Sequence, residues 1–265
     1  MTLESERNVS TMPHMDGVTG YFVPETQDVS NQVWRDMLGG NSITLNGAIQ
    51  SEKAVGLREN PHSWGQLYIG EPIIIYIIVK YKNDTLINKT SVPPVLTKSV
   101  YSQDSQGYYS FNVRGNKELA FWASSGNNDA LINNSDTTSF HVMCIAKAGD
   151  NSTISTYLDG NYVSSTPNPA KMGSYKGFYM LNNISHWTTP GIDFPWNFDY
   201  LMLAFGTQAH SAEQIKANSE WLYKNYISEE PDPVPDPYKG LKVYKDIILM
   251  DGAKILNEDG TEYIT

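Results

Sequence analysis

The sequence predicts an all-β protein built from two antiparallel sheets, and three observations lead to this class. Apolar runs of strand length alternate with clusters of Asn, Ser, Thr, Gly and Pro, which are typical of turns. Charged residues make up only 18% of the 265 residues and aromatic residues 12%, a composition typical of turn-rich β proteins. Helical spacing of apolar residues occurs in one short stretch that begins near Ser211.

The chain opens with a segment that we expect to lie outside this sandwich. Residues 1–17 are polar, lack hydrophobic periodicity and include Pro13. They predict an N-terminal arm that is flexible or docks on a neighbouring chain. We expect the sandwich domain itself to comprise residues 18–228.

Two runs predict central strands, because they are apolar at almost every position and both of their faces must therefore be covered. These runs are residues 73–81 and 200–205. Residues 108–113 and 119–123 alternate instead, which is typical of strands with one buried face. In the second of these strands Trp122 faces outward, where it either packs under a loop or contacts a ligand.

Residues 141–164 predict three strands joined by two turns. The run 141–148 is apolar, and Cys144 within it is expected to be a buried, inert thiol. Residues 153–158 alternate, and Asp159-Gly160 predicts a tight hairpin turn because such a turn needs positive φ angles.

The end of the chain predicts a helix, a linker and a small tail. Ser211 to Gln214 form a capping box that starts the helix. Residues 229–237 alternate proline with other residues and predict a semi-rigid linker. Residues 238–265 predict a small β tail, which has too few residues to fold alone and is expected to contact a partner chain.

Three spaced motifs resemble one superfamily. They are a Trp34–Asp36 pair before a Gly-Asn turn, the Tyr-Leu-Asp-Gly sequence at residues 157–160, and a strand with a short helix across residues 198–215. In this order they resemble the concanavalin A-like lectin/glucanase superfamily, particularly its laminin-G-like members, over roughly residues 18–227. The resemblance implies a two-sheet antiparallel jelly-roll β-sandwich with a short C-terminal helix and the small tail beyond the linker.

The superfamily's catalytic pattern is missing. Its glucanases carry a Glu-x-Asp-x-(x)-Glu strand, which supplies two carboxylates about 5 Å apart. The chain has no such triplet and no Gly-x-Ser-x-Gly motif, so we expect no enzymatic activity. Its candidate carboxylates are isolated in sequence: Glu118, Asp159, Asp193 and Asp199.

Neither a cofactor nor a nucleic acid is expected. Some laminin-G-like domains bind calcium, which stays an alternative here, but the loop carboxylates Asp129, Asp136, Asp150 and Asp193 do not form a spaced calcium loop. The net charge is -10 without a basic cluster, which excludes attraction to nucleic acid or an anionic membrane. No secretory signal is recognised, so we expect synthesis in a host cytoplasm.

One segment carries the composition of a sugar-binding site. Aromatic rings stack on pyranose faces while nearby amides, carboxylates and imidazoles bond the hydroxyls. The candidate ligand-binding residues are Asn182, Asn183, His186, Trp187, Asp193 and Trp196, with Trp122 on a second surface. The alternative is that these rings plug the end of the sandwich.

The resemblance implies a non-catalytic carbohydrate-binding module of a bacteriophage virion, in its tail, baseplate or fibre, that contacts host-surface glycans. The expected location is the virion, and the expected partners are host carbohydrate, other virion proteins and further copies of this chain. One alternative is a purely structural decoration or adaptor protein without glycan binding. A glycan hydrolase is the third hypothesis, which the missing carboxylates disfavour.

Overall fold

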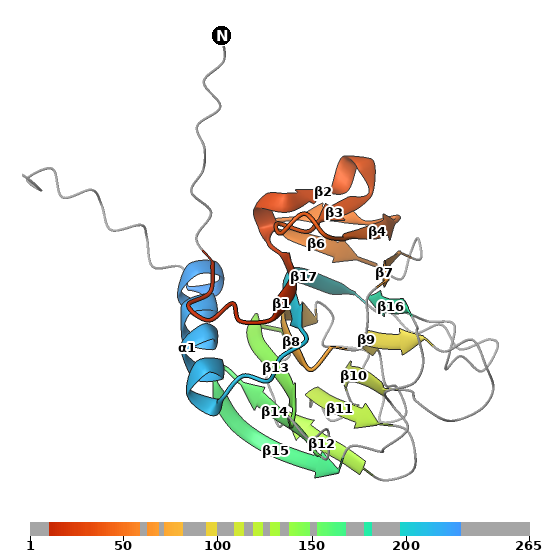
Figure 1. Ribbon diagram of the computed structural model, residues 1–265. Coiled ribbons are helices and arrows are strands. Elements are labelled where there is room, and N and C mark those ends of the chain that lie inside the picture. Colours follow the sequence, from red (N-terminus) through yellow and green to blue (C-terminus); the bar gives the residue numbers. More distant parts are fainter. Residues whose placement is uncertain are drawn as a thin grey trace, which may run out of the picture. The chain divides into compact units, whose positions relative to one another are not determined.

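The computed structural model describes residues 11–58, 63–68, 72–81, 94–99, 109–113, 119–123, 128–132, 138–148, 153–167, 178–181 and 197–228. Within these ranges the chain forms two antiparallel sheets and one short α-helix, which follows the last strand in sequence (Figure 1). The predicted all-β sandwich is therefore confirmed.

Sheet A contains the central strands. Its order is β15 (Asn161–Pro167), β14 (Thr153–Leu158), β13 (His141–Lys147), β8 (Ile74–Tyr81), β17 (Phe198–Gly206), β6 (Ala54–Leu57) and β5 (Ile49–Ser51). β1 (Val18–Phe22) also pairs with β17. The predicted central strands β8 and β17 thus pair with each other in the middle of the sheet.

Sheet B forms the second layer. Its order is β12 (Asn128–Ile132), β11 (Leu119–Ala123), β10 (Tyr109–Val113), β9 (Pro94–Ser99), β16 (Phe178–Leu181), β7 (Trp64–Tyr68), β4 (Ser42–Asn46), β3 (Val33–Arg35) and β2 (Gln27–Asp28). Two short 3-10 helices, η1 (Pro24–Thr26) and η2 (Val29–Asn31), lie between β1 and β3.

The inner core lies between the two sheets and combines apolar residues of both. Trp34 of β3 is fully buried there, with its ring edge-on to Phe22 at 5.9 Å and its indole nitrogen donating to the Val23 carbonyl at 2.9 Å. The partner residue Asp36 is structural, since its carboxylate accepts the amide hydrogens of Tyr21 and Leu38. The Trp-Asp motif therefore ties the first strands together.

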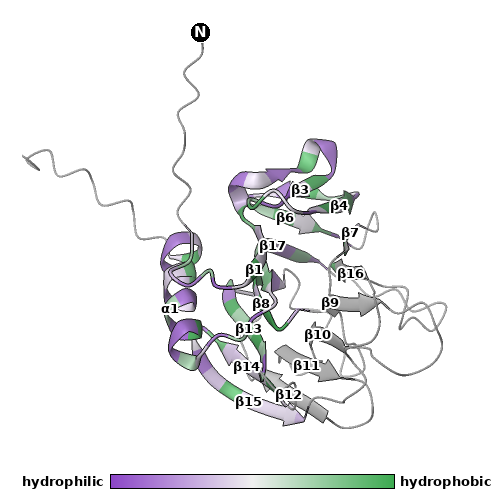
Figure 2. Cartoon of the chain, in the orientation of Figure 1, coloured by the Kyte–Doolittle hydropathy of each residue, from purple (hydrophilic) through white to green (hydrophobic). Residues whose placement is uncertain are grey.

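An outer core covers the other face of sheet A. The helix α1 (Ala212–Leu222) and the π-helical turn η3 (Tyr223–Ile227) contribute Ile215, Leu222 and Tyr226 to it. The apolar stripe of α1 faces the sheet and its polar side faces away (Figure 2). Both faces of β8 are thus covered, as its continuous apolar sequence predicts.

The helix begins where its capping box predicts. The hydroxyl of Ser211 accepts the Gln214 amide hydrogen at 3.3 Å, and the Ser211 amide donates to the Gln214 side-chain oxygen at 2.8 Å. No helix in the described ranges is long and apolar enough to span a membrane.

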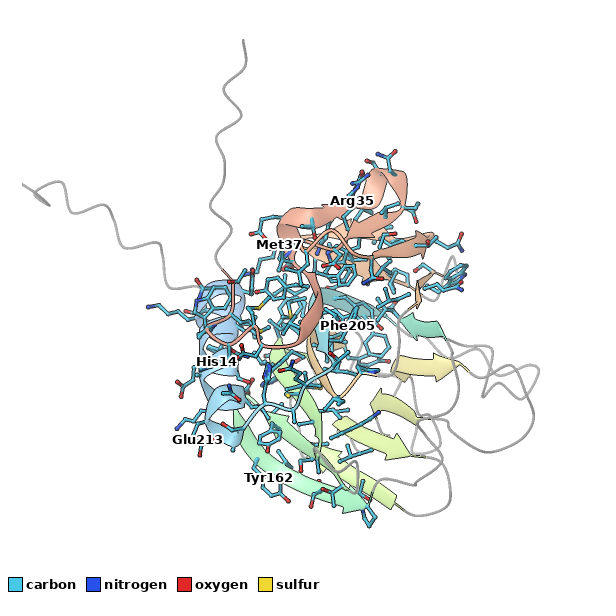
Figure 3. The ribbon with its side chains drawn as sticks, viewed as in Figure 1. His14, Arg35, Met37, Tyr162, Phe205 and Glu213 are labelled. Carbon is cyan, nitrogen blue, oxygen red and sulfur yellow. The ribbon has the colours of Figure 1, made fainter. Side chains whose placement is uncertain are left out.

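Residues 11–17, the described part of the N-terminal arm, do not lie outside the sandwich as the sequence predicted. Met12 is buried in the outer core. His14 lies beside α1 (Figure 3), and its amide and carbonyl both bond the side chain of Asn218 at 2.9 Å. Residues 11–17 therefore dock on their own chain rather than staying outside the core. A polar segment can do this because one buried amide side chain satisfies its backbone groups.

The chain divides into two compact units, Met1–Ser228 and Glu229–Thr265. The second unit lies outside the described residues, so the proline linker and the small β tail stay predictions.

Candidate functional site

The structure describes the two ends of the predicted sugar-binding segment but not the segment itself. Asn182, Asn183, His186, Trp187, Asp193 and Trp196 all lie outside the described residues. The chain enters the segment at Leu181, the last residue of β16, and leaves it before Phe198, the first residue of β17. Both residues are buried in the inner core.

Leu181 and Phe198 belong to different sheets but lie at the same end of the sandwich. Leu181 pairs with Gly65 of β7 in sheet B, and Phe198 pairs with Leu57 of β6 in sheet A. A short connection links β6 to β7, and the Ser63 amide donates to the Arg58 carbonyl within it at 2.8 Å. We call this region, around Arg58, Ser63, Leu181 and Phe198, the loop end.

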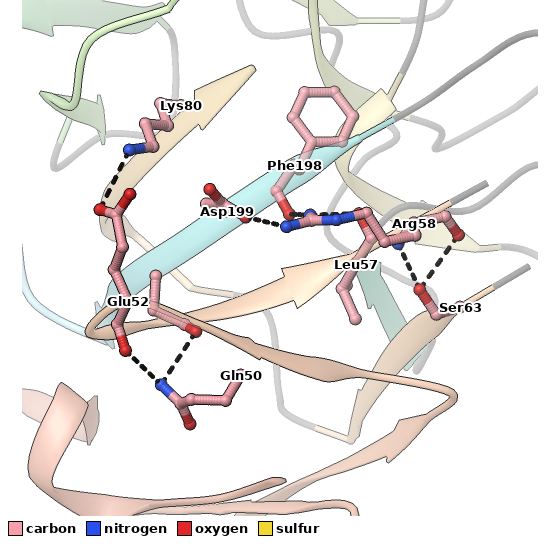
Figure 4. A network of polar contacts seen from close by, with 9 residues as sticks. Gln50, Glu52, Leu57, Arg58, Ser63, Lys80, Phe198 and Asp199 are labelled. Carbon is pink, nitrogen blue, oxygen red and sulfur yellow. Dashed lines mark hydrogen bonds and ion pairs between the residues drawn. The ribbon is translucent and has the colours of Figure 1, made fainter. Parts of the chain in front are cut away.

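Arg58 clamps the loop end together. Its Nη1 donates to the carbonyls of Phe198 at 2.8 Å and Leu57 at 3.1 Å, and its Nη2 lies 2.6 Å from Asp199 Oδ1 (Figure 4). The Ser63 hydroxyl donates to the Arg58 carbonyl and also accepts the Arg58 amide hydrogen. One side chain therefore joins the end of β6 to the start of β17.

This ion pair is shielded from water, since the side chains of Arg58 and Asp199 are only 13% and 1% exposed. A buried carboxylate is costly unless a cation or hydrogen bonds compensate it, and Arg58 supplies both. The guanidinium lies over Gly56, where an added Cβ would come within 2.7 Å of Nη2. Asp199, which the sequence leaves isolated, thus has a structural partner.

Trp122 stands apart from the loop end. Leu181 pairs with Leu96, Leu96 with Phe111, and Phe111 with Phe121, so one row crosses four strands. Trp122 occupies the next position of β11, three strands from β16, which corresponds to about 14 Å at the usual strand spacing. Whether Trp122 offers a second binding surface stays a prediction.

Two predicted isolated carboxylates are also separated in space. Asp159 accepts the Val142 amide hydrogen at 2.9 Å and lies 2.8 Å from His141 Nδ1, so it sits beside β13. Asp199 belongs to β17, two strands beyond β13 in the order of sheet A, and its carboxylate is paired with Arg58. The two carboxylates therefore have different basic partners, His141 and Arg58.

Among the described residues no group of three or more His, Cys, Asp and Glu side chains could hold a metal ion. Of the four loop carboxylates considered for calcium, Asp136, Asp150 and Asp193 lie outside the described residues, and Asp129 lies in β12. Cys144 is buried as predicted, and burial raises the pKa of its thiol well above the ordinary value.

A buried polar network that includes His210 lies under α1, and this histidine is not among the predicted site residues. His210 Nε2 donates to the Asp16 carbonyl at 3.0 Å, which leaves Nδ1 to accept from the Tyr76 hydroxyl at 2.9 Å. Asn218 donates to the same hydroxyl at 3.2 Å. Because these groups are buried, we assign the network to docking of the arm.

No protein-family model and no curated protein matches this chain. Several solved structures share its fold. The binding domain of botulinum neurotoxin serotype D has a TM-score of 0.59 and 11% identity, covering 78% of this chain and 52% of that one. A structure of botulinum neurotoxin type C, whose cell entry depends on interaction with two ganglioside molecules, has a TM-score of 0.59 and 10% identity, covering 78% and 51%.

A sialidase of Trypanosoma rangeli in complex with sialic acid has a TM-score of 0.61 and 11% identity, covering 83% of this chain and 35% of the enzyme. This chain therefore spans about half the length of the toxin structures and about a third of the sialidase. At such low identities the likeness establishes a shared β-sandwich fold.

Proposed function

We propose that this sandwich is a non-catalytic carbohydrate-binding module and that residues 182–196 contact the sugar. The observation that carries the proposal is the anchoring of this segment. Leu181 and Phe198, which flank it, are buried in two different sheets at one end of the sandwich. A segment rich in aromatic and amide side chains thus begins and ends on a rigid support, which is what a preorganised binding site needs.

The Arg58 clamp supports this proposal. It fixes the backbone carbonyl of Phe198, two residues after Trp196, through a short hydrogen bond and a buried ion pair. Of the structural neighbours, botulinum neurotoxin type C depends on two ganglioside molecules for cell entry, and the sialidase was solved in complex with sialic acid. This agrees with carbohydrate binding on the same kind of sandwich.

The more specific proposal is that the module belongs to a bacteriophage virion and contacts glycans of the host surface. It rests on the resemblance of the sequence to laminin-G-like sandwiches of tail, baseplate and fibre proteins. Other virion proteins and further copies of the chain are the proposed partners. A structural virion component without glycan binding is the competing hypothesis, which the test below addresses.

The test is a glycan array with the labelled full chain, followed by titration calorimetry on the best ligand. We expect Trp187→Ala and Trp196→Ala each to weaken binding about 5- to 150-fold, because a stacked ring contributes on the order of 1–3 kcal/mol. Trp187→Phe and Trp196→Phe are matched controls, since they keep a ring and should retain most of the affinity. Thermal unfolding of every variant should resemble that of the parent chain.

Two results would contradict the proposal. If Trp187→Ala or Trp196→Ala unfolds the domain, the ring is part of the core and the site assignment is wrong. If the array shows no bound glycan while the chain co-purifies with virion proteins, the structural hypothesis replaces the binding module.

A further inference from the structure

A second candidate surface lies on the outer face of β14 and β15, at one edge of sheet A. Ile154 belongs to the inner core and Tyr157 to the outer core, so alternate residues of β14 face opposite sides of the sheet. Register places Ser155 beside Ser165 and Tyr157 beside Tyr162. The outward residues Thr153, Ser155, Tyr162, Ser165 and Pro167 form what we call the β15 strip.

The helix leaves the β15 strip uncovered. α1 packs against β13, and its Lys216 and Ser219 lie against Gly160, in the turn that precedes β15. Beyond that turn, Tyr162 is 58% exposed, and Thr153, Ser165 and Pro167 are also exposed. The strip therefore faces solvent beside the first turns of α1, where Figure 3 labels Glu213.

The strip is uncharged. β14 reads Thr-Ile-Ser-Thr-Tyr-Leu and β15 reads Asn-Tyr-Val-Ser-Ser-Thr-Pro, without a single charged side chain. This is notable in a chain whose net charge is -10. At its border with α1, Glu213 accepts a hydrogen bond from the Ser211 hydroxyl, and Lys216 lies 3.9 Å from Glu220. A neutral ligand matches this surface better than an ionic one.

The exposed ring of the strip, that of Tyr162, is held in place by Tyr157. Tyr157 is nearly buried, and its ring lies edge-on to that of Tyr162 with the centroids 5.7 Å apart and an interplanar angle of 77°. Such a contact fixes the orientation of the outer ring. A large ring, fixed and exposed next to serine and threonine hydroxyls, is the combination that stacks on a pyranose and bonds its hydroxyl groups.

The edge of β15 is less suited to pairing with an added strand. β12, the edge strand of sheet B, lies beside both β14 and β15 without pairing to them. A peptide strand that added to the edge of β15 would meet β12. The accessible feature is therefore the outer face rather than the edge.

We propose that the β15 strip binds a neutral glycan chain, with Tyr162 stacked on one sugar ring. The seven residues of β15 extend over about 23 Å, which accommodates several sugar units. The inference extends the proposed carbohydrate-binding function to a second surface, distinct from residues 182–196.

The test is native gel electrophoresis of the full chain through gels that contain dextran, yeast mannan or soluble β-1,3-glucan. We expect at least one of these neutral polysaccharides to retard the parent chain. Tyr162→Ala should weaken that binding on the order of tenfold, whereas Tyr162→Phe should behave like the parent because it keeps the ring. Ser165→Arg should also weaken binding because it fills the strip.

Tyr223→Ala is the matched control, since Tyr223 is also an exposed tyrosine, 44% accessible, but lies in η3 outside the strip. Hydrogen exchange of residues 153–167 should slow in the polysaccharide that retards the chain. Retardation of Tyr162→Ala equal to that of the parent would overturn the inference, as would the absence of retardation in all three gels.

Trp187→Ala on the same gels separates the two proposals. If it abolishes retardation while Tyr162→Ala does not, the strip is not a site and the proposed function stands. If Tyr162→Ala alone weakens binding, the strip is the site and residues 182–196 are not.

Discussion

At the scale of single residues, the molecule depends on polar side chains that join distant strands. Arg58 and Asp199 are 141 positions apart in sequence, yet Nη2 of one lies 2.6 Å from Oδ1 of the other and both side chains are largely buried. Charges buried in this way contribute little net stability while both are present, but removing one leaves the other uncompensated.

We therefore expect Asp199→Ala to lower the free energy of unfolding by about 3–5 kcal/mol, the usual cost of breaking a buried pair. Urea unfolding measures the change. The pair Arg35–Asp28 offers a control, because its side chains are 59% and 21% exposed at a similar distance of 2.8 Å. Arg35→Met should cost no more than about 1 kcal/mol. Equal costs for the two changes would show that the Arg58 clamp is not buried in solution.

At the scale of elements, α1 and residues 11–17 together close the outer face of sheet A. Asn218 of α1 is fully buried and bonds both backbone groups of His14 and the hydroxyl of Tyr76. Three hydrogen bonds to one side chain make it the main polar attachment of the docked segment.

Asn218→Ala should destabilise the domain by about 2–4 kcal/mol, at about 1 kcal/mol for each hydrogen bond. It should also speed hydrogen exchange in residues 11–17 more than in β8, which hydrogen-exchange mass spectrometry measures. Asn225→Ala is the control, because Asn225 is exposed and its side chain donates to the Trp221 carbonyl, four residues earlier. Unchanged exchange in residues 11–17 would mean that Met12 and the hydrogen bonds to Asp16 and Gly17 hold the segment without Asn218.

The outer core also sets how stability responds to alkali. Burial raises the pKa of Tyr21 and Tyr76 above the usual range of tyrosine, and it raises the pKa of Tyr226 to about 12. In the unfolded chain these groups ionise near pH 10, so above that pH the folded state holds more protons than the unfolded state. Stability should therefore fall as the pH rises.

Above the pKa that a tyrosine has in the unfolded chain, each of these three residues should lower the free energy of unfolding by about 1.4 kcal/mol per pH unit. Urea midpoints between pH 8 and pH 11 measure the slope. Tyr21→Phe removes one ionisable group and should make the decline shallower by that amount. A flat profile to pH 11 would contradict the burial of these hydroxyls.

At the scale of the whole molecule, the sandwich and residues 229–265 form separate compact units. We expect truncation after Ile227 to leave a soluble, folded sandwich, since its two cores are built from earlier residues. Light scattering on the full chain and the truncated chain tests whether the tail mediates assembly. The full chain should form oligomers or bind a partner protein. If the full and truncated chains are both monomeric and no partner protein binds the full chain, the tail does not mediate assembly.

Local patterns explain which parts of the fold were predictable. The Ser211 capping box and the Asp159-Gly160 turn, with φ of 48° and 81°, involve neighbouring residues whose chemistry dictates one geometry. Continuous apolar runs likewise predicted the central strands. Arg58, His210 and Met12 escaped prediction because their partners come from distant strands or helices, whose register no local pattern specifies. The aromatic segment stays a prediction based on composition.

The pairing of β17 with strands from the whole length of the domain has a consequence for the timing of folding. β17 pairs with β1, β6 and β8, so sheet A cannot be completed until the last of its strands has been synthesised. Roughly 125 residues separate the end of β8 from the end of β17, which is about 6–25 s of synthesis at ordinary rates. During that interval the apolar β8 lacks its central neighbour. Exposed apolar strands tend to pair with other chains, so we expect chaperones that bind the growing chain to raise its yield of folded protein.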